Sequence, residues 1–469
     1  MDAINRLKPV LEPESIAVIG AQPHSGEQSF NIIENLESYG YGGRVYPVNP
    51  RYGEVLGRRS YPTVLEIPDD VDLAIISTPR GVVPEIIRQC AYKAVKAAIV
   101  VGQGFADATD EAGKRLQQEL VEISRRSNIR ILGPNTVGAA NAFANFSSAF
   151  TRQMDMCRIP VAIISQTGML FGTFEGLKLL GKGIDLGNAC DIDFSDALEY
   201  FEQDPQIKVI ALHMEGVRDI ERFKRVIRRV AMRKPVLVLK AGINEQAARM
   251  AQTHTASLIG RDEVWEAFFK QCGVIRVSDI DEMGDLVRAF CYLPPMRGRS
   301  LGIVSVSGGF GIMGMDACAK YGLNVAQLSP PTMLELEDMA PPWLGVGNPL
   351  DIWPIMMTSS QPLGQAFRTV LIKVLSDHRV NAVILIAGVW FDRVSPAVTE
   401  VIMEMVDSFP DKPIVWCPYE GWLYRIRIDE LADKLQKVGK STVFSSPDRA
   451  VKALAKLSWY YEFQRDDPC

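Results

Sequence analysis

One local pattern occurs three times along this chain of 469 residues and limits the folds that it can adopt. In each copy, a short run of apolar, β-branched residues is followed by a Gly/Ser-rich turn and then by a helical pattern. The copies begin at Ser15, Ile159 and Leu301, and their turns cover residues 20–26, 165–168 and 307–311. A strand, a tight glycine turn and a helix open a parallel α/β domain. The repetition predicts an α/β protein made of three doubly wound domains.

Further apolar runs and helical patterns alternate after each copy. Residues 71–76 and 209–214 have the composition of buried strands, and residues 111–125 and 220–233 have helical periodicity. Two irregular stretches, residues 145–157 and the Pro/Gly-containing residues 292–300, separate the copies. We therefore expect a first domain over 1–148, a second over 149–296 and a third over 297–469.

Composition argues against several classes of protein. The net charge of −5 offers no basic field for nucleic acid or anionic lipid. No apolar run approaches the roughly 20 residues that span a bilayer, and the N-terminus lacks the apolar core of a signal peptide. The eight cysteines are scattered without CxxC spacing, which indicates neither a zinc site nor a disulfide framework. We expect a cytoplasmic protein without a metal site, a nucleic-acid partner or a membrane partner.

The glycine turns are candidate anion sites. A helix that begins at such a turn offers unpaired backbone N–H groups and the positive end of its dipole, and phosphate is their usual ligand. The chain contains neither the GxGxxG fingerprint nor the GxxxxGK[S/T] loop of nucleoside triphosphatases. The turns therefore predict sites for phosphate or a phosphate ester. The alternative is that these glycines meet only a steric need of the turn.

His254 and Glu215 are the candidate catalytic pair. His254 is one of four histidines and lies among small residues after the apolar run 235–240. A neutral imidazole is a nitrogen nucleophile near pH 7. Glu215 directly follows the apolar run 208–214, at the strand end where α/β sheets bind ligands. A carboxylate against one imidazole nitrogen would leave the other free to attack. Spacing alone also permits an ordinary loop histidine and an exposed acid.

These residues resemble the α subunit of the NDP-forming acyl-CoA synthetases, which are relatives of succinyl-CoA synthetase. The resemblance runs from about residue 13 to about residue 450. The matching stretches are Ser15–Ala21, Tyr46–Pro50, Val71–Ile76, Gly133–Gly138, Ser165–Gly168, Leu186–Asn188 with Asp191 and Asp193, Glu215–Val217, Lys240–Gly242, His254–Leu258, Ser307–Gly311 and Asn348–Asp351. The resemblance implies an N-terminal Rossmann-like CoA-binding domain followed by two flavodoxin-like domains of the succinyl-CoA synthetase type.

The resemblance also implies roles for single residues. His254 would be phosphorylated transiently, and Glu215 would orient it. Phosphate would be held by two helix-start loops, with the residues Ser165, Gln166, Thr167, Gly168, Gly308, Gly309 and Gly311. Coenzyme A would be held by Gly20, Ala21, Gln22, Gly26, Val48, Asn49, Pro50, Ser77, Thr78, Pro79, Gly102, Gly104, Phe105, Gly133, Pro134 and Asn135. The chain departs from the family pattern at Ala256, where glycine is usual, and at Glu27, where a basic residue is usual.

The implied reaction is acyl-CoA + Pi + ADP (or GDP) = carboxylic acid + CoA + ATP (or GTP), through an acyl phosphate and a phosphohistidine. The resemblance places its Mg-nucleotide site on an ATP-grasp β subunit, and the absence of a P-loop from this chain agrees with that. One alternative is a non-catalytic, CoA-binding regulatory protein of the same fold, which Ala256 and Glu27 would allow. The other is a nicotinamide-dependent dehydrogenase, against which the missing GxGxxG argues.

Overall fold

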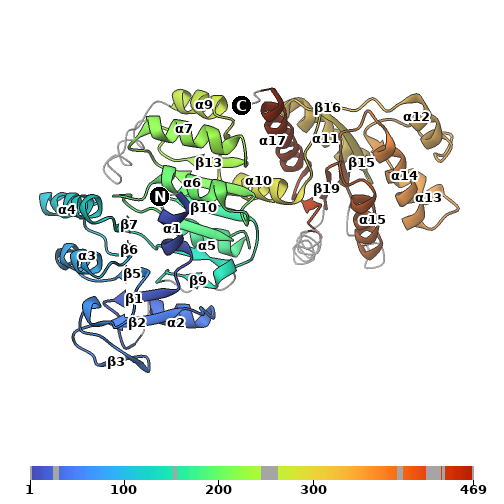
Figure 1. Cartoon of the computed structure of the whole chain (residues 1–469). Coiled ribbons are helices and arrows are strands. Elements are labelled where there is room, and N and C mark those ends of the chain that lie inside the picture. The colour runs from blue at the N-terminus through green and yellow to red at the C-terminus, as the bar shows by residue number, and fades with distance from the viewer. Residues whose placement is uncertain are drawn as a thin grey trace. The chain divides into compact units, whose positions relative to one another are not determined.

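The computed structural model describes residues 3–24, 31–150, 156–244, 262–387, 395–418, 435 and 439–466. The chain divides into two compact units, Met1–Gly284 and Asp285–Cys469. Each unit is built from predominantly parallel sheets with helices packed on them (Figure 1). The predicted α/β class is therefore confirmed, with two large sheets in the first unit and one in the second.

The first sheet has five parallel strands in the order β2-β1-β5-β6-β7. They are β1 (Ser15–Ile19), β2 (Arg44–Val48), β5 (Leu73–Ile76), β6 (Ala97–Val100) and β7 (Arg130–Leu132), and a hairpin of β3 (Glu54–Val55) and β4 (Arg58–Arg59) follows β2. Strands β1, β5 and β6 are buried along their whole length, which explains why all their residues except Ser15 are apolar. The strand order reverses between β1 and β5, and open α/β sheets bind ligands at such a point.

The second sheet has the order β14-β13-β12-β10-β11-β8-β9. Its parallel strands are β10 (Val161–Ser165), β11 (Lys182–Asp185), β12 (Val209–Met214), β13 (Val236–Lys240) and β14 (Ile275–Val277). Two antiparallel strands, β8 (Ala139–Asn141) and β9 (Phe146–Ser147), extend the sheet beyond β11. Here the order reverses between β10 and β12, so the loop after β10 lies at the reversal.

The third sheet, in the second unit, has the order β16-β15-β18-β19-β20, and β17 also pairs with β15. The strands are β15 (Ser300–Ser305), β16 (Asn324–Val325), β17 (Leu350–Asp351), β18 (Ala382–Ile386), β19 (Ile414–Cys417) and β20 (Thr442–Val443). In the first two sheets the first parallel strand lies between the second and the third, and in the third sheet β15 lies between β16 and β18 along the main path. This is the flavodoxin-like strand order.

Helices follow the strands as expected for doubly wound domains. The first unit contains α1 (Ala3–Leu11), α2 (Ile32–Ser38), α3 (Val83–Tyr92), α4 (Glu111–Ser127), α5 (Met169–Gly176), α6 (Phe194–Gln203), α7 (Ile220–Ala231) and α9 (Asp262–Gln271), and α10 (Ile280–Tyr292) runs across the division. The second contains α11 (Gly308–Tyr321), α12 (Pro330–Glu337), α13 (Trp353–Thr358), α14 (Leu363–Ser376), α15 (Ser395–Ser408) and α17 (Pro447–Asp466). Short 3-10 turns are η1 (Val64–Glu66), η2 (Arg80–Val82) and η3 (Ala142–Ala144).

Polar side chains set helix starts. Asp110 caps α4 by accepting a hydrogen bond from Gly113 N (2.7 Å), and Asp219 caps α7 by accepting one from Arg222 N (2.9 Å). Such caps satisfy backbone donors that have no partner within the helix. Asn128 ends α4 in the left-handed conformation, at φ 65°. Local sequence therefore accounts for where these helices begin and end.

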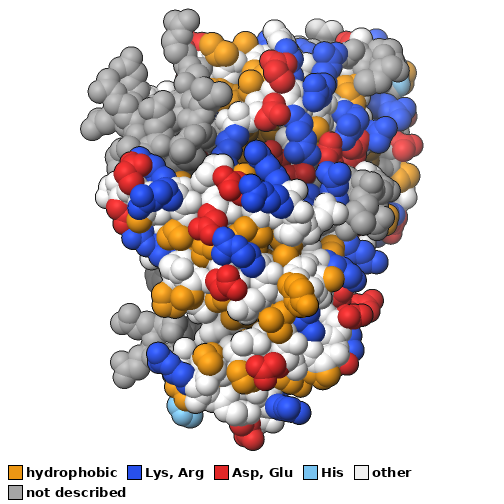
Figure 2. All heavy atoms as spheres, turned by 60° about the vertical axis from the view of Figure 1, so that its left-hand side comes forward, with side chains coloured by type: hydrophobic (Ala, Val, Ile, Leu, Met, Phe, Trp, Pro, Cys, Tyr) orange, Lys and Arg blue, Asp and Glu red, His pale blue; other side chains and the backbone are white. Residues whose placement is uncertain are grey.

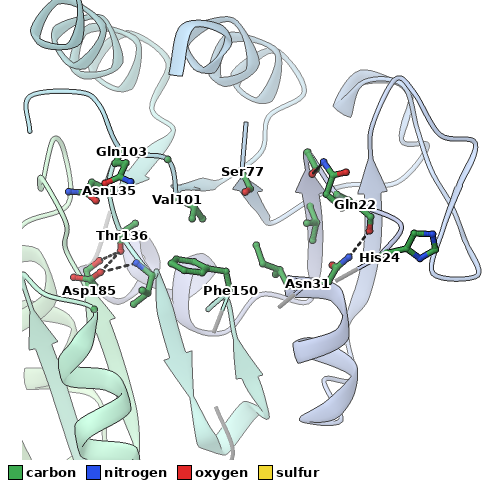
Figure 3. Close-up of a pocket in the computed structure, with 17 residues that line it drawn as sticks. Gln22, His24, Asn31, Ser77, Val101, Gln103, Asn135, Thr136, Phe150 and Asp185 are labelled. Atoms are coloured by element: carbon green, nitrogen blue, oxygen red, sulfur yellow. Dashed lines mark hydrogen bonds between the residues drawn. The ribbon is translucent and has the colours of Figure 1, made fainter. Parts of the chain in front are cut away.

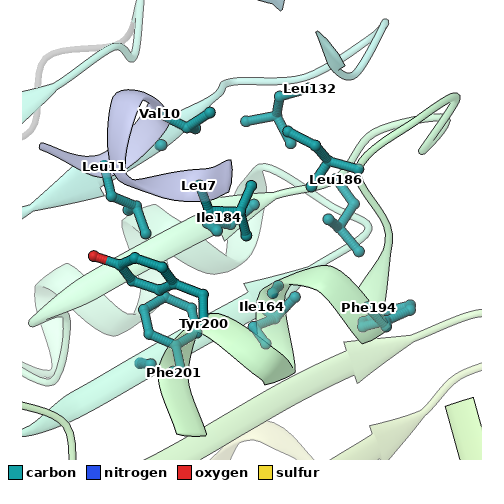
Figure 4. Close-up of a cluster of buried hydrophobic side chains, with 14 of the residues drawn as sticks. Leu7, Val10, Leu11, Leu132, Ile164, Ile184, Leu186, Phe194, Tyr200 and Phe201 are labelled. Carbon is teal, nitrogen blue, oxygen red and sulfur yellow. The ribbon is translucent and has the colours of Figure 1, made fainter. Parts of the chain in front are cut away.

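One hydrophobic cluster runs through both sheets of the first unit. The apolar face of α1, with Leu7, Val10 and Leu11, packs with Ile184 and Tyr200 of the second sheet and its helix α6 (Figure 4). The same cluster continues into residues of β1 and α2. This shared core explains why the two sheets form a single compact unit.

Ion pairs link α6 and α7. Arg222 of α7 donates to Asp196 (2.9 Å) and Glu199 (3.0 Å) of α6, and Arg229 pairs with Glu202 (2.8 Å). Acidic and basic side chains lie intermixed on the face drawn in Figure 2. These two arginines are therefore neutralised by acids on the neighbouring helix.

Lys182 of β11 is a fully buried cation. Its Nζ donates to Asp204 (2.7 Å) and Glu12 (3.1 Å) and lies 5.7 Å from the centre of the Phe143 ring. Burial tends to raise the pKa of Glu12, but hydrogen bonds from Lys182 and Tyr200 outweigh this effect and leave that pKa below its ordinary value. The ion pair therefore joins the segment after α1 to the second sheet.

We predict that Lys182→Met lowers the free energy of unfolding by about 3–5 kcal/mol at neutral pH, because it leaves two acids without their cation. Since the folded-state pKa of Glu12 is lowered, its contribution is present above the ordinary value of 4.5 and is lost as the pH falls. The difference between the proteins should therefore narrow in acid. Denaturant unfolding at several pH values measures it. The control is Lys114→Met, in an exposed pair on α4, which should change stability by less than about 0.5 kcal/mol.

Candidate functional site

A cavity of about 460 Å³ lies at the carboxyl ends of the first sheet, where the strand order reverses. Gly20 follows β1, Ser77 follows β5 and Gly102 lies after β6, and all three line the cavity. The lining continues to Gly168 and Asp185 of the second sheet. The cavity therefore connects the predicted ligand loops of the first domain with the predicted phosphate loop of the second.

Figure 3 shows how the lining side chains are distributed. Gln22 and His24 lie at one end, Thr136 and Asp185 lie at the other, and the ring of Phe150 lies between them. The lining is mixed, with amide, hydroxyl and carboxyl groups beside apolar surface. Such a shape suits a long ligand that has polar groups at both ends.

Gly20 is required by the close approach of two loops. Its φ is +88°, and a Cβ at this position would lie 2.2 Å from the main-chain oxygen of Ser77. Only glycine fits both the backbone conformation and this spacing. The absence of a side chain also keeps the cavity open at the reversal point, so the glycine predicted from the turn pattern has a steric reason.

The predicted CoA residues fall into two groups. Those that line the cavity are Gly20, Ala21, Gln22, Ser77, Gly102 and Asn135. Those in the same loops but outside the lining are Val48, Asn49, Pro50, Thr78, Pro79, Gly104, Phe105, Gly133 and Pro134. Gly26 and the divergent Glu27 lie outside the described residues.

Residues of the second group support the loops. Asn49 is buried, donates to the main-chain oxygen of Ala21 (2.8 Å) and accepts from Arg51 N (3.0 Å). Phe105 is buried in the core, and the N–H of Gly104 donates to Asp107 (2.8 Å). These contacts tie neighbouring loops together, so the residues shape the cavity without lining it.

The loop 165–168 connects β10 to α5 and is folded by its own side chain. Ser165 Oγ accepts from Thr167 N (2.9 Å) and donates to Thr167 O (2.7 Å). The turn leads directly into the start of α5, where backbone N–H groups lack helical partners. Gly168 packs against Val137, because a Cβ would lie 2.5 Å from the Cγ1 atom of Val137. The geometry suits a phosphate group at the cavity edge.

The second unit contains a turn of the same construction after β15. Ser305 Oγ accepts from Ser307 N (3.1 Å) and donates to Ser307 O (2.7 Å), and α11 begins at Gly308. Gly311 lies on the first turn of α11 and packs on Pro349, since a Cβ there would lie 2.9 Å from Pro349 Cβ. Gly308 and Gly309 are thus at a helix start, as predicted.

Glu215 directly follows β12, and its peptide group is held on both sides. Its N–H donates to Gln166 Oε1 (2.7 Å), which also accepts from Gly216 N (3.2 Å). Its main-chain oxygen accepts from Lys240 Nζ (2.8 Å). The side chain of Gln166, predicted to bind phosphate, thus links the phosphate loop to Glu215. This arrangement fixes the position from which the Glu215 carboxylate projects.

Burial is the main cause of the pKa shifts at this edge of the sheet. It raises the pKa of Asp185 to about 6, and the nearby Glu215 charge acts in the same direction. It lowers the pKa of Lys240 to about 8 and, together with the Lys240 charge, that of His213 to about 4. At pH 7, His213 is therefore neutral and Asp185 is close to its titration range.

His254 and Ala256 lie outside the described residues, so the pairing of His254 with Glu215 stays a prediction. Two further lining residues, His24 and Gln103, lie inside predicted loops, and the lining residues outside them are Val18, Asn31, Ile32, Val101, Thr136, Val137, Phe150 and Asp185. Val101 and Thr136 lie beside predicted loops, and adjacency could have indicated them. Phe150 carried no local signal. Asp185 carried no such signal either, because Lys182 and two glycines interrupt the residues before it.

Three family models match successive parts of the chain. They are described as a CoA binding domain over residues 14–142, a succinyl-CoA ligase-like flavodoxin domain over 158–290 and a ligase-CoA domain over 301–460. The ADP-forming acetate–CoA ligase II of Archaeoglobus fulgidus is 34% identical over 97% of this chain and 67% of its own length. The chain belongs to the ADP-forming acid–CoA ligases.

Other relatives agree with this assignment. The α subunit of ADP-forming acetate–CoA ligase I of Pyrococcus furiosus is 35% identical, over 96% of this chain and 97% of its own length. A solved structure of the dinucleotide-forming acetyl-coenzyme A synthetase 1 of Candidatus Korarchaeum cryptofilum, in complex with phosphate and ADP, has a TM-score of 0.86 at 30% identity, covering 98% of both chains. The ligase class and the α-type fold predicted from sequence are thereby confirmed.

Two further features of the described residues bear on the site. No helix among them is long and apolar enough to cross a membrane. Within the same residues, no group of three His, Cys, Asp or Glu side chains is placed to hold a metal ion.

Proposed function

We propose that this ligase interconverts an acyl-CoA and its free acid through an acyl phosphate and a phosphohistidine: acyl-CoA + Pi + ADP (or GDP) = carboxylic acid + CoA + ATP (or GTP). The observation that carries the proposal is the single cavity that runs from Gly20 to Gly168. It places loops suited to coenzyme A next to a helix start suited to phosphate. The reaction requires these two ligands to meet.

Coenzyme A lies in the cavity with its nucleotide end near Gly20 and Gln22 and its thioester near Gly168. A phosphate oxygen, held at the start of α5, attacks the thioester carbonyl. The new C–O bond forms as the C–S bond breaks, which yields an acyl phosphate and the CoA thiol. His254 then attacks phosphorus, a P–N bond forms, and the carboxylate leaves. Glu215 holds the imidazole in the tautomer that attacks.

The nucleotide site and the division of labour belong to the same proposal. The phosphorylated loop around His254 delivers its group to Mg-nucleotide on an ATP-grasp β subunit. The chain itself divides into a CoA-binding domain (1–148), a phosphohistidine domain (149–296) and a ligase-CoA domain with the second phosphate helix (297–469). Support comes from the relative named as an α subunit and from the absence of a P-loop motif in the sequence.

The CoA site can be tested at Gly20. We predict that Gly20→Ala weakens CoA binding at least tenfold, a loss of about 1.4 kcal/mol, because its methyl group would collide with the main chain at Ser77. Gly40→Ala is the matched control. Gly40 also has a positive φ, of +68°, but a Cβ there would meet only open space, so its variant shares the backbone strain without the collision. Titration calorimetry with CoA measures both, and thermal unfolding confirms that both are folded.

Absence of CoA binding to the intact wild-type chain would contradict the assignment of the cavity. It would instead favour a protein of this fold that has lost the reaction. Equal CoA affinity of the Gly20→Ala and wild-type proteins would place the CoA site elsewhere in the chain.

A further inference from the structure

Asp185 is a buried carboxyl group directly beside the phosphate loop. It ends β11, and in the register of the sheet it is the partner of Ser165, the first residue of the loop 165–168. Neighbouring residues of parallel strands are about 4.8 Å apart and project to the same face of the sheet. Asp185 is only 2% exposed, and it lines the cavity together with Gly168.

The side chain of Asp185 accepts its hydrogen bonds from uncharged groups. Oδ2 accepts from Val137 N (2.8 Å) and from Thr136 Oγ1 (3.1 Å), as Figure 3 shows, and Oδ1 accepts from Gly187 N (3.4 Å). In the part of the chain that the structure describes, no Lys, Arg or His side chain forms an ion pair with it. Because the contact with Gly187 N is long, Oδ1 can accept a further hydrogen bond.

The ionisable groups on neighbouring strands do not neutralise this carboxyl. Glu215, after β12, carries the same charge and acts unfavourably on ionised Asp185. His213 on β12 is held neutral by burial and by Lys240, whose ammonium group is directed at main-chain oxygens of Glu215 and Ala241. A buried carboxylate without a cation is costly unless a ligand supplies a proton or a donor.

Phosphate and sulfate differ in what they offer to such a group. At neutral pH phosphate carries at least one O–H, whereas sulfate carries none. A carboxylate accepts a hydrogen bond from the first and repels the second. An acidic group beside an anion site therefore selects a protonated oxyanion, and the same group can take the proton when the oxygen reacts.

We propose, on the basis of the function proposed above, that Asp185 is a further catalytic residue that accepts a hydrogen bond from a protonated oxygen of the phosphate and removes that proton as the oxygen attacks the thioester. The C–O bond forms and the C–S bond breaks. The proton on Asp185 then passes to the departing sulfur, which yields the CoA thiol and regenerates the carboxylate. The step needs no reactant beyond acyl-CoA and phosphate.

Asp185→Asn is the sharpest variant, because asparagine keeps the shape and an acceptor for Val137 N but cannot take a proton. Its amide would also offer a donor to sulfate. The matched control is Asp219→Asn, which removes a carboxylate from the same domain at a helix cap where asparagine serves equally well. Thermal unfolding and CoA titration establish that each variant is folded with its CoA site intact.

The first measurement is calorimetric titration of the intact chain with inorganic phosphate and with sulfate. We expect the wild type and Asp219→Asn to prefer phosphate, and Asp185→Asn to lose at least tenfold of that preference, as expected for one hydrogen bond to a charged group. An unchanged preference in Asp185→Asn would overturn the proposal.

The second measurement is release of CoA thiol from acetyl-CoA with phosphate or arsenate, which needs no nucleotide. Asp185→Asn should be slower by about 10²-fold or more. The wild-type rate should fall as the pH drops through about 6, where the Asp185 carboxylate is protonated, and the variant should lack this dependence. Phosphate itself also changes its protonation with pH, but this affects the wild type and the variant equally. A variant with the wild-type rate and pH profile would refute the role. A wild-type chain that binds neither anion would contradict the proposed function and this inference together.

Discussion

Replacing His254 with alanine is expected to abolish phosphorylation of the protein. Wild-type protein incubated with acetyl-CoA and phosphate should gain one phosphoryl group that is labile in acid and stable in base, as a P–N bond requires. Intact-mass measurement before and after acid treatment tests this. The residues around His254 in the sequence are small, so we expect them to leave room for a phosphoryl group.

Glu215→Gln should leave the phosphorylation site intact but slow the reaction by about 10²–10⁴-fold, because an imidazole without an oriented tautomer is a poor nucleophile. The peptide of Glu215 is clamped by Gln166 and Lys240, so the substitution should not displace the main chain. His378→Ala is the control, since His378 is exposed in the second unit. A label that survives in His254→Ala, or a stable label on serine, would contradict the assignment.

The second large effect concerns the nucleotide. We expect the purified chain alone to form no ATP or GTP from acetyl-CoA, phosphate and the diphosphate, because no motif in it provides a triphosphate site. Addition of the cognate ATP-grasp subunit should restore turnover and produce a stable hetero-oligomer, which coupled nucleotide assays and size-exclusion chromatography measure.

This prediction separates two halves of the reaction. The first step, release of CoA thiol with phosphate, should proceed with or without the partner. Nucleotide formation should require the partner. Robust nucleotide synthesis by the isolated chain would show that it contains a nucleotide site of its own, and would remove the need for a partner.

Local patterns were sufficient where local physics decides the structure. The helical pattern at 111–125 became α4, Glu111–Ser127, because Asp110 caps its start and Asn128 ends it in the left-handed conformation. The apolar run 209–214 became β12, because a strand that is buried on both faces has a nearly continuous apolar sequence. The order of loops along the chain was also enough to relate it to its family, because loops that bind ligands carry specific residues at specific spacing.

Tertiary structure decided which residues meet. Nothing near residue 182 in the sequence indicates that Lys182 binds Glu12, or that α1 shares a core with β11, because these contacts join segments more than a hundred residues apart. The side chain of Gln166 was assigned to phosphate from its position in a turn, but strand pairing brings it to the backbone of Glu215. Asp185 became a candidate only through its register with Ser165. The sequence alone determined the strand–turn–helix units and their candidate chemistry, because these depend on neighbours along the chain. The register and order of the strands, which depend on distant pairing, determined how that chemistry is assembled.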